Sequence, residues 1–110
     1  MDTYHIWCNL REGVKDIEFC AHVERYLGGL REKGLVGGHR ITRRKLGFGP
    51  PELGEFHITI EVRDLAQLDA AFRQVARREG EVESHHAAVY RAAKDVRFAL
   101  YRDFPGSERE

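Results

Sequence analysis

The sequence predicts a single ferredoxin-like domain of the α+β class, a four-stranded antiparallel sheet with two helices on one face. Strand-like and helix-like segments follow one another in the order βαββαβ, with one extra segment before the last strand. Both helical segments are amphipathic, and 110 residues leave room for one hydrophobic core. We therefore expect residues 1–110 to form one domain.

The first strand is predicted over residues 3–10, where side chains alternate between two faces. One face is typical of a core. The other pairs His5 with Trp7, the only tryptophan of the chain, and is neither plainly polar nor plainly apolar. The predicted core face consists of Tyr4, Ile6, Cys8 and Leu10.

A helix is predicted over residues 14–33, because apolar side chains recur at helical spacing and Gly34 suits a helix C-terminus. The second strand, residues 39–46, has few apolar markers. If Ile41 faces the helices, its neighbours at even positions face away from them. A stretch rich in glycine and proline, residues 47–54, is predicted to be a loop.

The third strand, residues 55–62, alternates strictly and points Phe56, Ile58, Ile60 and Val62 toward the helices. The second helix is predicted to begin at Asp64 as the N-cap, with Gln67 completing a capping box, and to end near Arg78.

Residues 82–94 fit either a short helix or an irregular connection. The last strand is predicted over residues 96–104, with Val96, Phe98 and Leu100 on its core face. Residues 105–110 are expected to form a frayed tail.

In this topology no helix is expected over the second face of the sheet. That face gathers imidazole, aromatic, arginine and carboxylate side chains. Such mixed surfaces are typical of ligand pockets and also of dimer interfaces, and both interpretations remain open. The predicted members are His5, Trp7, Asn9, His57, Thr59, Glu61, Arg97, Ala99 and Tyr101, joined by Arg40, Thr42, Arg44 and Leu46 if Ile41 points inward.

This pattern resembles the dimeric α+β barrel superfamily, which includes antibiotic-biosynthesis monooxygenase-like and stress-responsive barrel proteins. The stretches YHIWCNL, RITRRKLGFGPPELGEFHITIE and FALYRDFP also look like a small bacterial family of unknown function. The resemblance implies a homodimer whose two open sheet faces pack around a cavity. It carries no catalytic residue.

The candidate catalytic residues are His5, His57 and Tyr101. The two histidines are predicted on neighbouring strands and on one face, where they could share a proton, a metal or a substrate, and imidazole titrates near neutral pH. Tyr101 could polarise a carbonyl group. The structural alternative is that each histidine donates a hydrogen bond to a carbonyl or carboxylate across an interface.

The candidate ligand-binding residues are Trp7, Asn9, Arg44, Phe48 and Thr59. Trp7 would form a wall, or an interface anchor, and Arg44 would bind an anion. Phe48, between two glycines, would close over a pocket as a lid, or belong to a rigid connection.

Several partner and cofactor classes are not expected. Equal numbers of basic and acidic residues, 18 each, argue against a general nucleic-acid binder, and the stretch KLGFG departs from the RNP1 pattern of RNA-binding domains. No apolar stretch is long enough for a membrane span. No metal-ligand spacing, dinucleotide fingerprint or phosphate loop is recognisable, so neither a metal nor another cofactor is expected.

The isolated cysteines, Cys8 and Cys20, indicate a reduced, cytoplasmic protein, and no signal peptide is visible. Three functions are retained. The first is an enzyme or binder acting on a small aromatic or carbonyl compound. The second is a non-catalytic dimeric structural or regulatory module. The third is an RNA-binding open sheet.

Overall fold

The computed structural model describes residues 1–106 as a four-stranded antiparallel sheet with three helices. The strands lie in the order β2-β3-β1-β4, which is the predicted ferredoxin-like arrangement. Of the predicted tail, residues 107–110 lie outside the described part of the chain. The elements are β1 (Asp2–Leu10), α1 (Asp16–Glu32), β2 (His39–Arg43), β3 (Phe56–Val62), α2 (Leu65–Ala76), α3 (Gly80–Ala92) and β4 (Ala93–Arg102).

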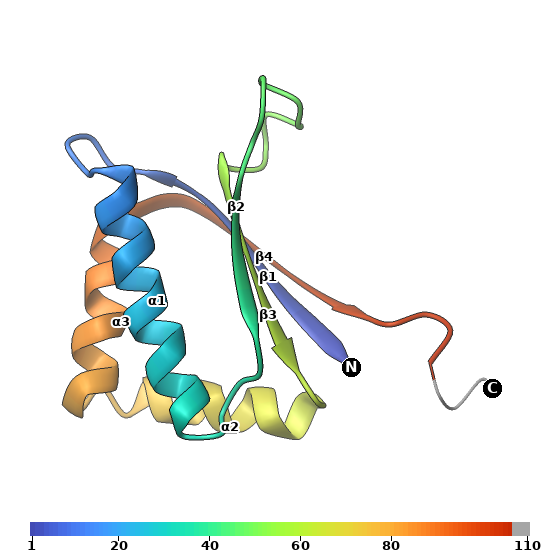
Figure 1. Cartoon of the computed structure of the whole chain (residues 1–110). Helices are drawn as coiled ribbons and strands as arrows, with labels where there is room; N and C mark the ends of the chain where they lie inside the picture. Colours follow the sequence, from blue (N-terminus) through green and yellow to red (C-terminus); the bar gives the residue numbers. More distant parts are fainter. Residues whose placement is uncertain (107–110) are drawn as a thin grey trace.

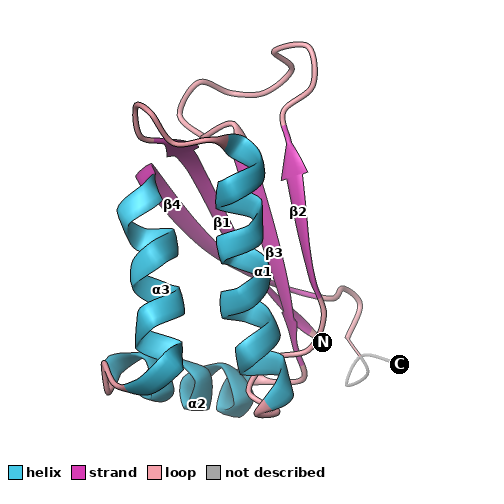
Figure 2. Ribbon diagram, turned by 60° about the vertical axis from the view of Figure 1, so that its left-hand side comes forward, coloured by secondary structure: helices cyan, strands magenta, loops and turns pink. Residues whose placement is uncertain are grey.

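All three helices lie on one side of the sheet (Figure 1). Helices α1 and α3 run side by side, and α2 lies across their ends (Figure 2). The core forms between these helices and the inward side chains of the sheet, because alternation on β3 and helical spacing on α1 bring their apolar side chains together. From these two elements the core receives Phe19, Val23, Leu27, Leu30, Phe56, Ile58, Ile60 and Val62.

The helix ends follow the predicted local chemistry. Gly34 adopts a positive φ of 73° directly after α1, and its N–H donates to the Arg31 carbonyl at 2.9 Å. At the start of α2, the Asp64 carboxylate accepts from the Gln67 N–H at 2.9 Å. The Gln67 side chain returns to the N–H of Arg63 instead of that of Asp64, so the capping box is shifted by one residue.

A third helix is the main addition to the predicted architecture. Residues 80–92 form α3, which resolves the open interpretation of this segment in favour of a helix. Consequently β4 begins at Ala93 instead of residue 96. None of the helices within residues 1–106 is long and apolar enough to cross a membrane.

Strand β2 is shorter than predicted, because its pairing with β3 stops at Arg43, opposite Phe56. Arg44 and Leu46 therefore belong to the following loop and not to the open sheet face. Leu46 has a positive φ of 54°, which ends the extended backbone. Ile41 pairs with Ile58 and faces the helices, as the prediction for this strand required.

Two predicted core residues of β4 are only partly covered. Phe98 is 61% exposed and Leu100 is 48% exposed. β4 is an edge strand of the sheet and extends beyond the layer of helices (Figure 1). Phe98 stacks on Tyr4 of β1 with ring centroids 5.9 Å apart, but no helix seals it from solvent within residues 1–106.

Candidate functional site

The open face of the sheet brings His5 and His57 into direct contact. Antiparallel pairing of β1 with β3 places Trp7 opposite His57 and Thr59 opposite His5. The two imidazoles meet diagonally across this register, with His5 Nδ1 2.9 Å from His57 Nε2. One ring must donate and the other must accept, so the pair shares one proton between these two nitrogens.

The surroundings favour the neutral form of His57. Partial burial, and secondly the neighbouring His5, lower the pKa of His57 below its usual value of 6.5. Neither histidine makes a further side-chain hydrogen bond within the part of the chain described. The outer nitrogens are Nε2 of His5 and Nδ1 of His57. Neither has a hydrogen-bond partner in residues 1–106 and neither is fully buried, so both can accept or donate a hydrogen bond to a ligand.

Two aromatic side chains complete this group, which we call the aromatic–histidine cluster: His5, Trp7, His57 and Tyr101. The Trp7 ring lies parallel to His57, with centroids 4.5 Å apart and planes 9° apart. Tyr101 of β4 meets His5 edge-on at 4.9 Å. Rings from three strands therefore contact one another on the face that the helices leave open, with three rings stacked and Tyr101 edge-on.

Thr59 lies in register with His5 on this face, beside Arg40 of β2. Thr42 lies opposite His57 and donates from Oγ1 to the His57 carbonyl at 3.2 Å. These positions confirm the predicted facing of β2 up to Arg43, and they place polar side chains beside the cluster on its β2 side.

The loop after β2 forms a hollow of about 330 Å³ beside the cluster. Trp7 and His57 contribute one wall, and Arg44 and Phe48 contribute the other. The Arg44 guanidinium donates to the carbonyls of Pro50, at 2.8 Å, and Leu53. Arg44 therefore holds the loop in shape, and Phe48 stays exposed at its tip.

Asn9 does not line this hollow. Its Oδ1 accepts from the Glu55 N–H at 2.9 Å, and its Nδ2 donates to Asp95 at 3.1 Å. The side chain thus ties β3 to β4 across the end of β1, where the β1–β4 register shifts between Trp7 and Asn9. Both halves of its amide are engaged in positioning the strands.

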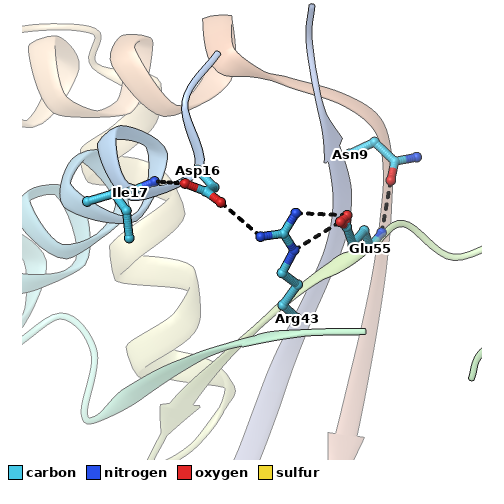
Figure 3. A network of polar contacts seen from close by, with 5 residues as sticks. All are labelled: Asn9, Asp16, Ile17, Arg43 and Glu55. Atoms are coloured by element: carbon cyan, nitrogen blue, oxygen red, sulfur yellow. Dashed lines mark hydrogen bonds and ion pairs between the residues drawn. The ribbon is translucent and has the colours of Figure 1, made fainter. Parts of the chain in front are cut away.

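A network of charges fixes the same end of the sheet against α1 (Figure 3). Arg43 donates to Asp16 at 2.9 Å and to Glu55 at 3.0 Å. The Ile17 N–H, followed by Arg43, lowers the pKa of Asp16. This network is structural, and it anchors the strand ends from which the loop around Phe48 emerges.

The sequence interpretation missed a second hollow, which lies between the helices and the sheet. It has a volume of about 370 Å³ and depends on α3, whose helical state the sequence left open. Its lining includes Tyr4, Phe19, Tyr26, Phe72, His86 and Phe98. The signal that could have found it is the spacing of His86, Val89 and Tyr90, which places them on one face once residues 80–92 are helical.

No group of three histidine, cysteine or acidic side chains within residues 1–106 is placed to hold a metal ion. Cys8 and Cys20 are free thiols. Burial raises the pKa of the Cys8 thiol to about 11, so this side chain is protonated near neutral pH and is a poor nucleophile.

Comparison with known proteins places the chain in a family without an established activity. The model of a family of unknown function, DUF6614, matches residues 1–110, and the chain belongs to this family. No curated protein matches the chain.

Solved structures share the fold at low sequence identity. A protein of Arabidopsis thaliana has a TM-score of 0.74 and 8% identity over 97% of this chain and 99% of its own. SnoaB, a cofactor-independent oxygenase from Streptomyces nogalater, has a TM-score of 0.69 and 13% identity over 96% and 95%. A dimeric ferredoxin-like protein of unknown function from Jannaschia has a TM-score of 0.64 and 13% identity over 94% and 100%. These similarities establish the ferredoxin-like fold.

Proposed function

We propose that this member of the DUF6614 family is a homodimer in which two open sheet faces pack around the aromatic–histidine cluster. Tyr101 is 62% exposed in the single chain, and Trp7 lies on the same face without helices, on the other side of His5. Aromatic side chains of this kind are enriched at protein interfaces. Similar structures from Bacteroides fragilis and Jannaschia are described as dimeric, which supports the same assembly here.

The cavity enclosed in this way would bind and transform a small organic compound with an aromatic ring or a carbonyl group. The observation that carries this proposal is the 2.9 Å contact between His5 and His57, directly under Trp7. Trp7 and Tyr101 would form flat walls, and Thr59 would offer a hydroxyl group beside the pair.

The histidine pair has a property suited to acid–base chemistry. In a neutral pair one imidazole N–H occupies the shared hydrogen bond. Of the two outer nitrogens, one then carries a proton and the other has a free lone pair, whichever way the shared proton points. The pair thus offers a base and an acid together. The base would remove a proton from carbon next to a carbonyl group, and the acid would stabilise the oxygen of the resulting enolate.

The other predicted site residues take supporting roles in this proposal. Arg44 would hold the loop after β2 in shape, and Phe48 at the tip of this loop would border the entrance. Asn9 would position the strands. No cofactor is invoked, and the similarity to a cofactor-independent oxygenase supports that choice. The two free thiols support a cytoplasmic location.

The first test is light scattering over a dilution series, followed by titration of aryl ketones such as acetophenone. Trp7 fluorescence reports binding, because Trp7 is the only tryptophan. Exchange of the ketone's α-hydrogens in D2O, followed by NMR, reports catalysis. His57→Ala should remain dimeric and lose both signals, whereas His39→Ala, on β2 and away from the cluster, should retain them. A monomeric protein, or unchanged exchange in His57→Ala, would contradict the proposal.

A second candidate is a non-catalytic dimeric module. The close stacking of Trp7 on His57 favours it, because the two rings already cover each other's faces. In this case His57→Phe would keep the dimer, and no ketone would bind to the wild type. Nucleic acid is not proposed as a partner, since β3 presents one histidine and one threonine, His57 and Thr59, on the open face instead of the stacking aromatics of RNA-binding sheets.

A further inference from the structure

We propose that the hollow between the helices and the sheet binds an apolar monocarboxylate, with Arg78 recognising the carboxylate. This site, which we call the helix-side cavity, lies on the opposite face of the sheet from the aromatic–histidine cluster. It is therefore a binding site additional to the proposed function and does not depend on it.

The floor of the helix-side cavity is entirely apolar in character. Cys8, Phe19 and Ile58 form it and are 1%, 0% and 2% exposed. The protonated Cys8 thiol behaves as a small hydrophobic group. The volume of about 370 Å³ lies at the lower end of the range for small-molecule pockets. A hydrocarbon chain or a single substituted ring suits these dimensions.

The rim consists of aromatic side chains that the fold leaves exposed. Phe72 of α2, Tyr90 of α3 and Phe98 of β4 all retain large exposed surfaces. The Tyr4 ring lies between two of them, with its centroid 5.5 Å from that of Phe72 and 5.9 Å from that of Phe98. A contiguous exposed apolar surface that leads into a cavity is characteristic of a binding site.

Charged groups gather where the helix-side cavity opens. Arg78, His86 and Tyr90 line both this cavity and an adjoining hollow of about 430 Å³. Arg91 lines the adjoining hollow as well. Neither Arg78 nor Arg91 forms an ion pair with an acidic side chain in residues 1–106. A guanidinium group next to an apolar chamber matches a carboxylate joined to an apolar body, because it can donate two parallel hydrogen bonds.

One acidic side chain near the opening would repel a carboxylate, so the test includes a ligand with a cationic head group. Glu83 lines the adjoining hollow, and its Oε2 is buried without a hydrogen-bond partner in the described part of the chain. It would attract an ammonium head group instead of a carboxylate. Two arginines face this single carboxylate, so the balance of charge at the opening favours an anion.

The backbone fixes the position of Arg78 relative to the cavity. Arg78 follows α2 with a positive φ of 52°, and Gly80, at the start of α3, has a φ of 71°. The tight connection between the two helices therefore sets the direction in which the Arg78 side chain leaves the chain. Glutamine at this position keeps the same backbone requirement, so Arg78→Gln tests the charge without relieving the strain.

The experiment compares octanoate, octanol and octylamine, which share an apolar body and differ in the head group. Binding is measured by calorimetry and by NMR shifts of residues lining the cavity. We expect octanoate to bind about 10-fold tighter than octanol, the effect of one charge-assisted interaction. Tighter binding of octylamine, equal binding of octanoate and octanol, or no binding of octanoate would overturn the proposal.

Two variants locate the binding, each with a control on the same segment. Arg78→Gln should remove the preference for octanoate, and Arg77→Gln, which lines neither hollow, should keep it. Ala76→Trp places a ring into the cavity from its exposed rim and should abolish binding, whereas Ala66→Trp on the same helix should not. Octanoate binding unaffected by Ala76→Trp would place it elsewhere and refute the proposal.

The two proposals fail independently. His57→Ala should leave octanoate binding unchanged, because the cluster lies across the sheet. Octanoate should likewise leave the fluorescence of Trp7 unchanged in the wild type. Loss of octanoate binding in His57→Ala would contradict the assignment of two separate sites.

Discussion

His5 Nδ1 and His57 Nε2 lie 2.9 Å apart, although neither residue is the direct strand partner of the other. The contact runs diagonally from β1 to β3, and the direct partner of His57 is Trp7, whose ring covers the imidazole. The same arrangement explains the electrostatics of His57. Partial desolvation and the nearby His5 both disfavour its protonated form.

Folding stability should therefore decrease as the pH falls through the usual titration range of histidine. The pKa of His57 is lower in the folded state than in the unfolded state, so between the two values the unfolded chain binds more protons. The stabilising contribution is complete above about pH 6.5, the unfolded value, and is lost below it. Urea unfolding at about pH 8 and about pH 5.5 measures the change.

His57→Gln provides the reference for this pH dependence. It removes the imidazole and retains a polar side chain at the same position. The stability of this variant should decrease less between the two pH values than that of the wild type. An equal decrease would mean that other groups cause the pH dependence. His22→Gln, at a half-buried site on α1 outside the cluster, should leave the decrease unchanged.

The pairing of the histidines could be predicted from the sequence because it depends on two simple regularities. Side chains alternate along a strand, and the order βαββαβ makes the first and third strands neighbours. Together they place His5, Trp7 and His57 on one face. The register that makes the imidazoles touch is a matter of strand pairing, which the alternation alone leaves undetermined.

The roles of Asn9 and Arg44 could not be predicted in the same way. Both side chains bind backbone or side-chain groups that come close only after the chain has folded, at Glu55 and Asp95 for Asn9 and at the loop carbonyls for Arg44. The helix-side cavity was missed for a related reason, although the spacing of His86, Val89 and Tyr90 places these residues on one face of α3. The cavity exists only if residues 80–92 are helical and if this helix leaves Phe98 uncovered. The apolar spacing on β4 does not indicate which of its side chains a helix covers.

Tyr101→Ser should weaken self-association by about 10-fold or more, because exposed aromatic side chains that anchor an interface contribute at least 1–2 kcal/mol. Tyr101 sits on the open face and contacts His5 edge-on. Tyr90→Ser is the matched control, since Tyr90 is similarly exposed, at 69% against 62%, but lies on α3 behind the sheet. Sedimentation equilibrium measures both. Equal weakening in the two variants would show that the open face is not the interface.

Asn9→Ala should destabilise the fold by about 1–3 kcal/mol, since it leaves the Glu55 N–H without its partner and removes the link to Asp95. Asn9→Asp retains the acceptor for the Glu55 N–H but places a carboxylate next to Asp95, so it should destabilise more at neutral pH than at acidic pH. Denaturant unfolding checks both. If Asn9→Ala were as stable as the wild type and lost ketone binding instead, Asn9 would contact the ligand.

Two glycine-to-alanine substitutions should have opposite effects on stability. Gly54 packs directly against the backbone of β1, and a Cβ there would lie 2.7 Å from the Cα of Cys8, so alanine forces the loop away from the strand. Because a backbone cannot yield as a flexible side chain does, we expect a loss of about 2 kcal/mol or more. Gly28 lies within α1 with no atom within 4 Å of the added Cβ, and alanine there should stabilise by about 0.5–1 kcal/mol. Thermal and denaturant unfolding of both variants measure the two signs. A stable Gly54→Ala protein would mean that the loop after β2 is not held against β1, which would also remove the wall that Arg44 and Phe48 contribute beside the cluster.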